Sequence, residues 1–230
     1  MRYSLALLFL MSCGMAPKPQ TFSSSLGDAV GTSPNPELPP QPPTPKETLE
    51  EKYSYVDPDH EVPTEALYNA LAYYETKLQL GAIDNKNYMS VIDMSQKSNK
   101  RRYYLIDMRS GDVETLLVAH GQGSDSNNDG YATRFSNEDG THASSLGFYM
   151  TAETYSGNNG YSLRLDGMNS TNSNARSRAI VVHGASYVDP NRTIIGRSWG
   201  CPALEPAESR RVINLIRSGS VLYIYHKDFM

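Results

Sequence analysis

The spacing of hydrophobic residues changes once along the chain, and the change separates a helical segment from a region of strands. Within residues 62–84, apolar side chains recur every three or four positions from Leu67 to Leu78, which predicts an amphipathic helix that ends at Gly81. From Tyr88 onward the apolar residues alternate with polar ones or form short runs, and both patterns are typical of strands. One N-terminal helix followed by a β-rich region is therefore expected.

The β-rich region, residues 85–230, contains more predicted strands than helices. Loops rich in Ser, Asn, Gly and Asp separate the strands, notably 121–130 and 167–174, and a second amphipathic helix is predicted over 205–217. Short strands joined by turns, with helices beside them, predict a mostly antiparallel β domain with peripheral helices. The predicted strands are 89–94, 102–107, 113–118, 147–151, 161–165, 179–183 and 220–225.

The first residues predict export and a lipid anchor. A short apolar run, residues 5–11, falls well short of the about 20 residues that a transmembrane helix needs. The run leads into Leu10-Met11-Ser12-Cys13, which resembles the lipobox of bacterial lipoproteins. Residues 1–12 are therefore predicted to be a lipoprotein-type signal peptide that precedes a lipidated Cys13. The alternative is an ordinary signal peptide in which this cysteine is incidental.

Residues 13–48 are predicted to be a disordered tether rich in serine and proline, with a polyproline II section. No aspartate follows Cys13 directly, so in a Gram-negative host we expect an exported, periplasmic protein anchored in the outer membrane. The net charge of −4 and the pI near 5.7 argue against a nucleic-acid partner.

A second chemical signal lies near the C-terminus, where Cys201 occupies a loop bracketed by glycines. It is the one cysteine besides Cys13, and an unpaired thiol is unusual in an exported protein. A buried strand-like run delivers His183 to its end, where Gly184 allows close approach of another group. A thiol, a histidine whose imidazolium lowers the thiol pKa, and free backbone N–H groups are the parts that nucleophilic catalysis needs.

The segments around these residues resemble a known family. His183-Gly184-Ala185 and Gly196-Arg197-Ser198-Trp199-Gly200-Cys201-Pro202-Ala203-Leu204 are similar to the active-site signature of YkuD-type L,D-transpeptidases, in particular to murein L,D-transpeptidase catalytic domain proteins. The chain departs from the commoner pattern at Trp199, where histidine is usual, and at Pro202-Ala203, where the family has Arg or Asn after the cysteine. The resemblance covers roughly residues 85 to 226 and extends through 119–124, 135–137, 144–149 and 178–182.

The resemblance implies a YkuD-like antiparallel β-sandwich or barrel and a reaction on peptidoglycan stem peptides. Cys201 would attack the carbonyl of the third residue of a tetrapeptide stem, expel the terminal D-Ala and form a thioester. His183 would take the thiol proton and later activate the incoming amine, with the Gly184 carbonyl orienting its ring. Transfer of the acyl group to another stem would form a 3–3 crosslink. Neither a metal nor an organic cofactor is implied.

Other interpretations remain open. Water as the acceptor would make the protein an L,D-carboxypeptidase, and a free D-amino acid would make it an exchange enzyme on the same stems. A non-catalytic peptidoglycan-binding lipoprotein would keep the fold without the chemistry. A cysteine peptidase acting on proteins would be expected to orient its histidine with Asn or Asp, and its thiol would lie on a papain-like helix instead of a glycine loop.

The remaining candidates for substrate contact also have simple structural interpretations. Trp199 forms either a wall beside the thiol or part of the core, and Arg197 meets either a substrate carboxylate or solvent. The histidines and Cys201 show no zinc-ligand spacing, so no metal site is predicted. The expected substrate-binding residues are His120, Ser124, Asn137, Ser145, Arg197, Ser198, Trp199 and Gly200.

Overall fold

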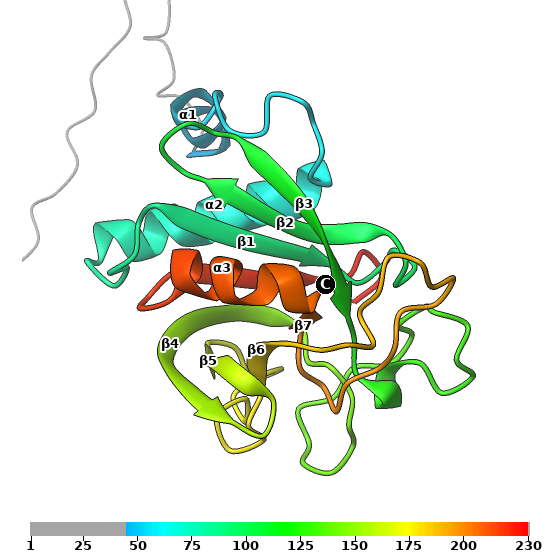
Figure 1. Ribbon diagram of the computed structural model, residues 1–230. Helices are drawn as coiled ribbons and strands as arrows, with labels where there is room; N and C mark the ends of the chain where they lie inside the picture. Colours follow the sequence, from blue (N-terminus) through cyan, green and yellow to red (C-terminus); the bar gives the residue numbers. More distant parts are fainter. Residues whose placement is uncertain (1–44, 230) are drawn as a thin grey trace, which may run out of the picture. The chain divides into compact units, whose positions relative to one another are not determined.

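The computed structural model describes residues 45–229 (Figure 1). The predicted signal peptide, the lipidation site Cys13 and residues 13–44 of the predicted tether lie outside the described residues. In chain order the elements are α1 (Pro45–Lys52), α2 (Thr64–Gln79), β1 (Tyr88–Asp93), β2 (Arg101–Asp107), β3 (Val113–Ala119), the 3₁₀ helix η1 (Gln122–Ser124), β4 (Gly147–Gly157), β5 (Gly160–Gly167), β6 (Val181–Gly184), β7 (Ala203–Leu204), α3 (Pro206–Ile216) and β8 (Val221–Tyr225).

Eight strands close into a barrel in the order β1-β2-β3-β7-β6-β5-β4-β8. Six neighbouring pairs are antiparallel, whereas β1 with β8 and β6 with β7 are parallel. The predicted mostly β, mostly antiparallel barrel with peripheral helices is confirmed. The parallel pair β6–β7 brings His183 opposite Ala203, two residues after Cys201.

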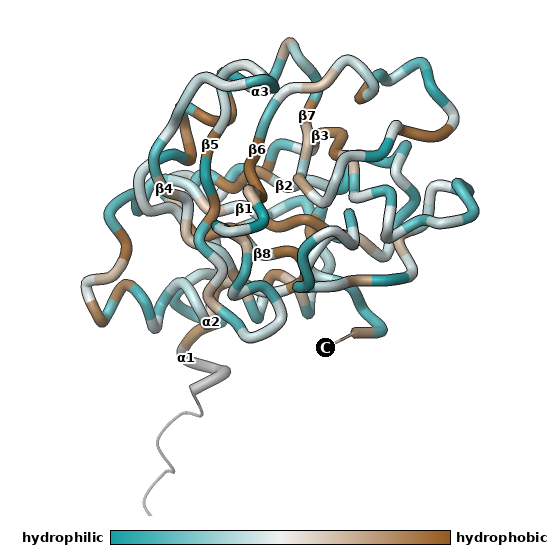
Figure 2. The backbone as a smooth tube through the Cα atoms, turned by 90° about the horizontal axis from the view of Figure 1, so that it is seen from below, coloured by the Kyte–Doolittle hydropathy of each residue, from teal (hydrophilic) through white to brown (hydrophobic). Residues whose placement is uncertain are grey.

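Alternate residues of the strands face two different hydrophobic cores, as expected for a sheet covered on both sides. In β8, Leu222 and Ile224 face the barrel interior, and Val221, Tyr223 and Tyr225 face the outside, where α2 packs. Helix α3 contributes its apolar side to the interior, and Figure 1 shows it between the β1–β3 half and the β4–β6 half of the sheet. In Figure 2 the hydrophobic positions gather on the strands, while the long loops are mostly hydrophilic.

The N-terminal packing begins earlier than predicted. Leu49, Tyr53 and Val56 are buried against α2, and the Tyr53 and Tyr74 rings meet edge to face at 6.2 Å. The last residues of the predicted tether, 45–48, therefore belong to a helix, and the packed part of the chain starts before Val62. The prolines before this short helix favoured a disordered segment, whereas the helix packs through apolar residues that follow them.

Two strand predictions differ from the structure near Cys201. The predicted strand 179–183 begins only at Val181, because Ala179 has a φ of +53°, which an extended strand excludes. The two-residue strand β7 was not predicted, since two apolar residues after a proline carry no periodicity. No helix within the described part of the chain is long and apolar enough to cross a membrane.

Candidate active site

His183 stands at the end of β6, between β5 and β7, and is 4% exposed. Its Nδ1 lies 3.0 Å from the carbonyl oxygen of Gly184. Because a carbonyl only accepts, Nδ1 carries the hydrogen and Nε2 is left as the basic nitrogen. Burial lowers the pKa of His183, and the hydrogen bond to Gly184 opposes that shift only in part. The resting imidazole is therefore a neutral base.

Gly184 fits this position because α3 packs directly against it. A Cβ atom at Gly184 would lie 2.4 Å from the Ser209 hydroxyl oxygen and 3.4 Å from the Cα of Pro206. The close approach that the sequence predicted at this glycine is made by the start of α3. The glycine thus lets the helix support the same peptide unit whose carbonyl orients His183.

Cys201 lies just before β7, and its side chain is buried, with 9% of the residue exposed. Its Sγ lies 3.6 Å from the carbonyl oxygen of Ala179, and the backbone N–H of Val181 also contacts the sulfur. Burial raises the pKa of the thiol, and the Val181 N–H and the charge of Arg178 offset this only partly. Desolvation thus shifts both groups toward their neutral forms and opposes the predicted thiolate–imidazolium pair in the resting site.

The loop that carries the thiol is closed by the Ser198 hydroxyl. This hydroxyl donates to the Cys201 carbonyl oxygen at 2.6 Å and accepts the Gly200 N–H at 3.1 Å. The Ser198 backbone joins the end of β3, since its N–H donates to the His120 carbonyl and its own carbonyl accepts the Gln122 N–H. Ser198 is 5% exposed, so it shapes the loop and presents almost no surface to a ligand.

Gly200 is required by both its conformation and its surroundings. Its φ of +115° is a region that residues with a Cβ rarely adopt, and a Cβ there would lie 2.8 Å from the Ala143 carbonyl oxygen. The Ser144 hydroxyl donates to the Gly200 carbonyl at 3.3 Å. Within the described residues the backbone N–H of Cys201 has no protein acceptor, so it is free to donate to a developing oxyanion.

This arrangement supplies the parts for acyl transfer through a cysteine: a buried thiol, a neutral base with a fixed tautomer on the adjacent chain segment, and a free backbone donor. The part of the chain that the structure describes contains no group of three His, Cys, Asp or Glu residues able to hold a metal ion.

Residues 58–225 match the family model YkuD_2, described as the L,D-transpeptidase catalytic domain. The chain belongs to this family. No curated protein sequence matches the chain significantly.

Several solved L,D-transpeptidases are similar to this domain at low identity. One from Mycobacterium smegmatis is 11% identical with a TM-score of 0.38, covering 60% of this chain and 58% of its own. One from Mycobacterium tuberculosis H37Rv is 14% identical with a TM-score of 0.40, covering 60% of this chain and 57% of its own. One from Stackebrandtia nassauensis is 12% identical with a TM-score of 0.37, covering 77% and 74%. The chain thus spans less than two thirds of the length of the two mycobacterial proteins.

His120 does not line a groove in the transpeptidase domain, because it is 1% exposed and both ring nitrogens are engaged. Arg102 Nη2 donates to Nδ1 at 2.8 Å, and Nε2 lies 3.3 Å from an Asp125 carboxylate oxygen. Burial, with the nearby Arg102 charge, lowers the pKa of His120 to about 4. His120 is part of a buried network beside the loop that carries Cys201, and its carbonyl accepts the Ser198 N–H of that loop.

The other predicted polar contacts are also taken up within the protein. The Ser124 hydroxyl is buried and accepts the Ser144 N–H at 3.0 Å. The Ser145 hydroxyl is buried and meets the Tyr149 hydroxyl at 2.6 Å. Asn137 is half-buried and joins two loops by donating to the carbonyl of Ser170 at 2.9 Å. For Ser124, Ser145 and Asn137, loop support is the role that these contacts favour.

Arg197 and Trp199 lie on the loop that carries Cys201, and solvent reaches both of them. Arg197 is half-buried and donates to the Asp125 carbonyl oxygen. Trp199 is 70% exposed, so the core-packing interpretation is wrong and the indole stands at the surface beside the thiol loop. Its ring stacks on His142 with centroids 4.8 Å apart and planes inclined by 7°.

His142 and Arg178 lie near Cys201 but were not predicted as site residues. His142 has a φ of +51°, and its Nδ1 accepts from the Gln122 amide at 2.8 Å, which fixes the ring under Trp199. Arg178 lies beside Gly200 and lowers the pKa of Cys201. Both residues are distant in sequence from Cys201, and neither belongs to a motif with an evident chemical role.

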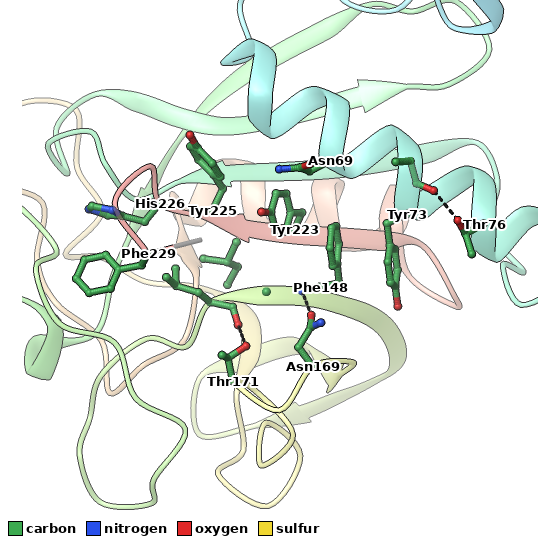
Figure 3. Close-up of a pocket in the computed structure, with 14 residues that line it drawn as sticks. Asn69, Tyr73, Thr76, Phe148, Asn169, Thr171, Tyr223, Tyr225, His226 and Phe229 are labelled. Carbon is green, nitrogen blue, oxygen red and sulfur yellow. Dashed lines mark hydrogen bonds between the residues drawn. The ribbon is translucent and has the colours of Figure 1, made fainter. Parts of the chain in front are cut away.

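An aromatic cavity of about 550 Å³ lies elsewhere on the domain, and neither Cys201 nor His183 lines it (Figure 3). It lies between α2, β8 and the loop around Asn169 and Thr171. The Tyr73 and Tyr223 rings stack on opposite sides of Phe148, with centroids 4.0 and 4.2 Å from it. Because these ring faces cover one another, they are not open platforms for a ligand.

Proposed function

We propose that this protein is a cysteine-dependent L,D-transpeptidase that acts on peptidoglycan tetrapeptide stems and forms 3–3 crosslinks. The observation that carries the proposal is the orientation of His183: its Nδ1–H is committed to Gly184, and its Nε2 remains basic on the strand paired with the segment after Cys201. Membership of the L,D-transpeptidase catalytic domain family supports the substrate class.

The proposed first step is acylation of the thiol. Sγ leaves the Ala179 carbonyl by rotation about its Cα–Cβ bond, and Nε2 of His183 takes the thiol proton as Sγ attacks the carbonyl carbon of the third stem residue. The backbone N–H of Cys201 donates to the oxyanion. The tetrahedral intermediate collapses with cleavage of the amide bond, and the imidazolium gives its proton to the departing D-Ala nitrogen.

The second step releases the acyl group. A side-chain amine of another stem attacks the thioester carbonyl, His183 removes the amine proton, and the C–S bond breaks to regenerate the thiol. Water or a free D-amino acid in place of that amine gives the carboxypeptidase and exchange reactions. The thioester keeps the acyl group activated, so the crosslinking step needs no external energy source.

The proposed location follows from the N-terminal sequence and the substrate. A polymer outside the cytoplasmic membrane requires an exported enzyme, and the lipobox at Cys13 supports a lipoprotein anchored in the outer membrane. The serine- and proline-rich segment before α1 then acts as the tether between the anchor and the catalytic domain.

The test is mass spectrometry of disaccharide-tetrapeptide muropeptides incubated with the purified protein and, in parallel, with its Cys201→Ala variant. We expect 3–3 linked dimers with the unaltered protein only. Tripeptides without dimers would establish a carboxypeptidase instead. No change in any muropeptide would contradict an enzymatic role and favour the non-catalytic peptidoglycan-binding lipoprotein.

A further inference from the structure

Arg178 is a half-buried cation near the nucleophile that pairs with no carboxylate among residues 45–229. Two arginines nearby in sequence behave differently: the exposed Arg176 pairs with Asp166 at 2.5 Å and with Glu153 at 2.7 Å, and the half-buried Arg164 pairs with Glu153 at 3.1 Å. Removing a charge from water without a counter-charge is costly, so an unpaired and partly buried guanidinium favours an anionic ligand.

The guanidinium is held in a fixed position by neutral acceptors from two loop segments. Nη1 donates to the Ser136 carbonyl oxygen and Nη2 to the Ala143 carbonyl oxygen, both at 2.7 Å. A longer contact of 3.5 Å joins Nη1 to the Ser145 hydroxyl. Since a guanidinium has five N–H donors, Nε–H and a second hydrogen on Nη2 remain without a protein acceptor within the described residues.

This cation stands next to the residue that precedes the nucleophile. A Cβ atom on Gly200 would lie 3.4 Å from Arg178 Nη2, and the charge of Arg178 acts on the Cys201 thiol. Arg102 offers no comparable site, because it is fully buried and donates to His120 and to backbone carbonyls. Arg197 lies on the loop that carries Cys201, but its guanidinium donates to the Asp125 carbonyl.

We propose that Arg178 binds the terminal carboxylate of the D-amino acid that leaves the acyl donor. The inference rests on the proposed function, which puts the scissile carbonyl at Cys201. The leaving residue follows that carbonyl directly, and one residue spans about 3.8 Å, so its carboxylate lies close to any group beside the thiol. A carboxylate is the anion that a guanidinium pairs with best, through two parallel hydrogen bonds.

The assignment makes Arg178 the residue that selects a tetrapeptide with a free terminal carboxylate. The residue after the nucleophile is Pro202, which carries no charge, so no cation adjoins Cys201 on its C-terminal side. Arg178 provides the positive charge from the segment that leads into β6.

Binding, measured without turnover, is the first test. In a Cys201→Ala background, isothermal titration calorimetry compares a disaccharide-tetrapeptide ending in free D-Ala with the same compound ending in D-alaninamide. We expect the acid to bind about 10- to 100-fold more tightly than the amide. Arg178→Gln should remove this preference and leave amide binding unchanged. Arg176→Gln is the matched control, because that guanidinium already has two carboxylate partners.

Equal binding of acid and amide by the protein with Arg178, or an equal loss for both in Arg178→Gln, overturns the proposal. A third ligand, amidated at the side-chain carboxylate of the third residue, separates the two sources of carboxylate: loss of affinity for that ligand alone overturns the assignment to the leaving residue. Arg178→Lys keeps the charge, so recovery of the acid preference in this variant supports a charge contact even if Arg178→Gln folds poorly.

Release of D-Ala by the protein that retains Cys201 is measured separately. A protein that prefers the acid through Arg178 but releases no D-Ala contradicts the proposed function and leaves the binding assignment intact. The rate at which iodoacetamide alkylates Cys201 is the remaining readout. If Arg178→Gln lowers this rate but leaves the preference for the acid unchanged, Arg178 acts only on the thiol, and the proposed carboxylate contact is overturned.

Discussion

His183 donates its Nδ1–H to the carbonyl oxygen of Gly184, the next residue in the chain, at 3.0 Å. Cysteine enzymes often orient the histidine with a separate carboxylate or amide side chain, and this site uses a backbone carbonyl instead. The carbonyl carries no full charge, so it fixes the tautomer without strongly stabilising an imidazolium. This explains why burial governs the protonation of His183 and keeps the base neutral.

Removal of the proposed nucleophile should abolish turnover, removal of the proposed base should reduce it strongly, and both changes should spare the fold. We expect Cys201→Ala to release no D-Ala from tetrapeptide muropeptides, and His183→Gln to lower kcat/KM by about 10²- to 10⁴-fold, the usual contribution of a general base. Thermal unfolding followed by circular dichroism serves as the folding control. Turnover by a folded Cys201→Ala protein would rule out the proposed nucleophile.

The rate at which the resting thiol is alkylated should keep rising with pH, even at pH values where an activated cysteine would already have reached its maximal rate. Because burial raises the pKa of Cys201 above its ordinary value of 9.0, the thiolate is scarce at neutral pH. The iodoacetamide rate should therefore rise about tenfold per pH unit up to pH 9 and continue to increase above it. A plateau below pH 7 would instead indicate a resting thiolate–imidazolium pair. Cys201→Ala is the blank for this measurement.

The buried Arg102–His120–Asp125 network should make the fold sensitive to mild acid. The pKa of His120 falls from 6.5 to about 4 on folding, so the unfolded chain binds this proton more readily. The free energy of unfolding should keep the full contribution of His120 above pH 6.5. It should decrease as the pH falls below that value, by about 3 kcal/mol in all once the pH is below 4.

His120→Gln tests this source of acid sensitivity. The glutamine amide can accept from Arg102 through its oxygen and donate to Asp125 through its nitrogen, but it does not titrate. Chemical denaturation at pH 7 and pH 5 should show a smaller loss of stability for this variant than for the unaltered protein. An identical loss in both proteins would assign the acid sensitivity to other groups, such as His183 and His226, whose pKa values are also lowered by burial.

Gly121 couples the end of β3 to the nucleophile loop, and a methyl group there should disturb the site. A Cβ would lie 2.3 Å from the His142 carbonyl oxygen and 2.8 Å from the Gly200 Cα, so backbone must move. We expect Gly121→Ala to cost about 1–3 kcal/mol of stability and to reduce kcat more than KM. Gly160→Ala in the β4–β5 turn, where nothing lies within 4 Å, should leave turnover unchanged. Equal effects of both variants on kcat would contradict this coupling.

The proposed lipid anchor is testable through Cys13 alone. Cys13→Ser removes the thiol through which the predicted lipobox would be joined to its lipid, so it should release the protein from the membrane fraction. Unchanged membrane association of this variant would refute lipidation, and Cys201→Ala, which keeps the lipobox, is the matched cysteine control.

Much of the fold could be predicted from sequence, because strands and amphipathic helices leave periodic traces. Helix α3, predicted over 205–217, spans Pro206–Ile216, and most strands overlap their predicted ranges. Cys201 and His183 stood out as candidates because a lone thiol and a strand-terminal histidine are chemically distinctive. The two-residue strand β7 was not predictable, since its partners β3 and β6 are far away in sequence.

The supporting residues of the site were harder to predict, because their roles depend on contacts between distant segments. His120 looks like a groove residue in sequence, but Arg102, 18 residues earlier, encloses it. Trp199 looks like a core residue, yet His142 holds it at the surface. Arg178 acquires its position from carbonyls of Ser136 and Ala143, which no local pattern connects to it.

The exposed stack of Trp199 on His142 gives the protein an internal optical probe. The chain contains one tryptophan, so all of its indole fluorescence arises two residues from the nucleophile. Emission should respond when a ligand covers the indole, which allows binding to be followed without a label. The same emission is a poor monitor of unfolding, because an indole that is already 70% exposed changes its surroundings little when the chain unfolds.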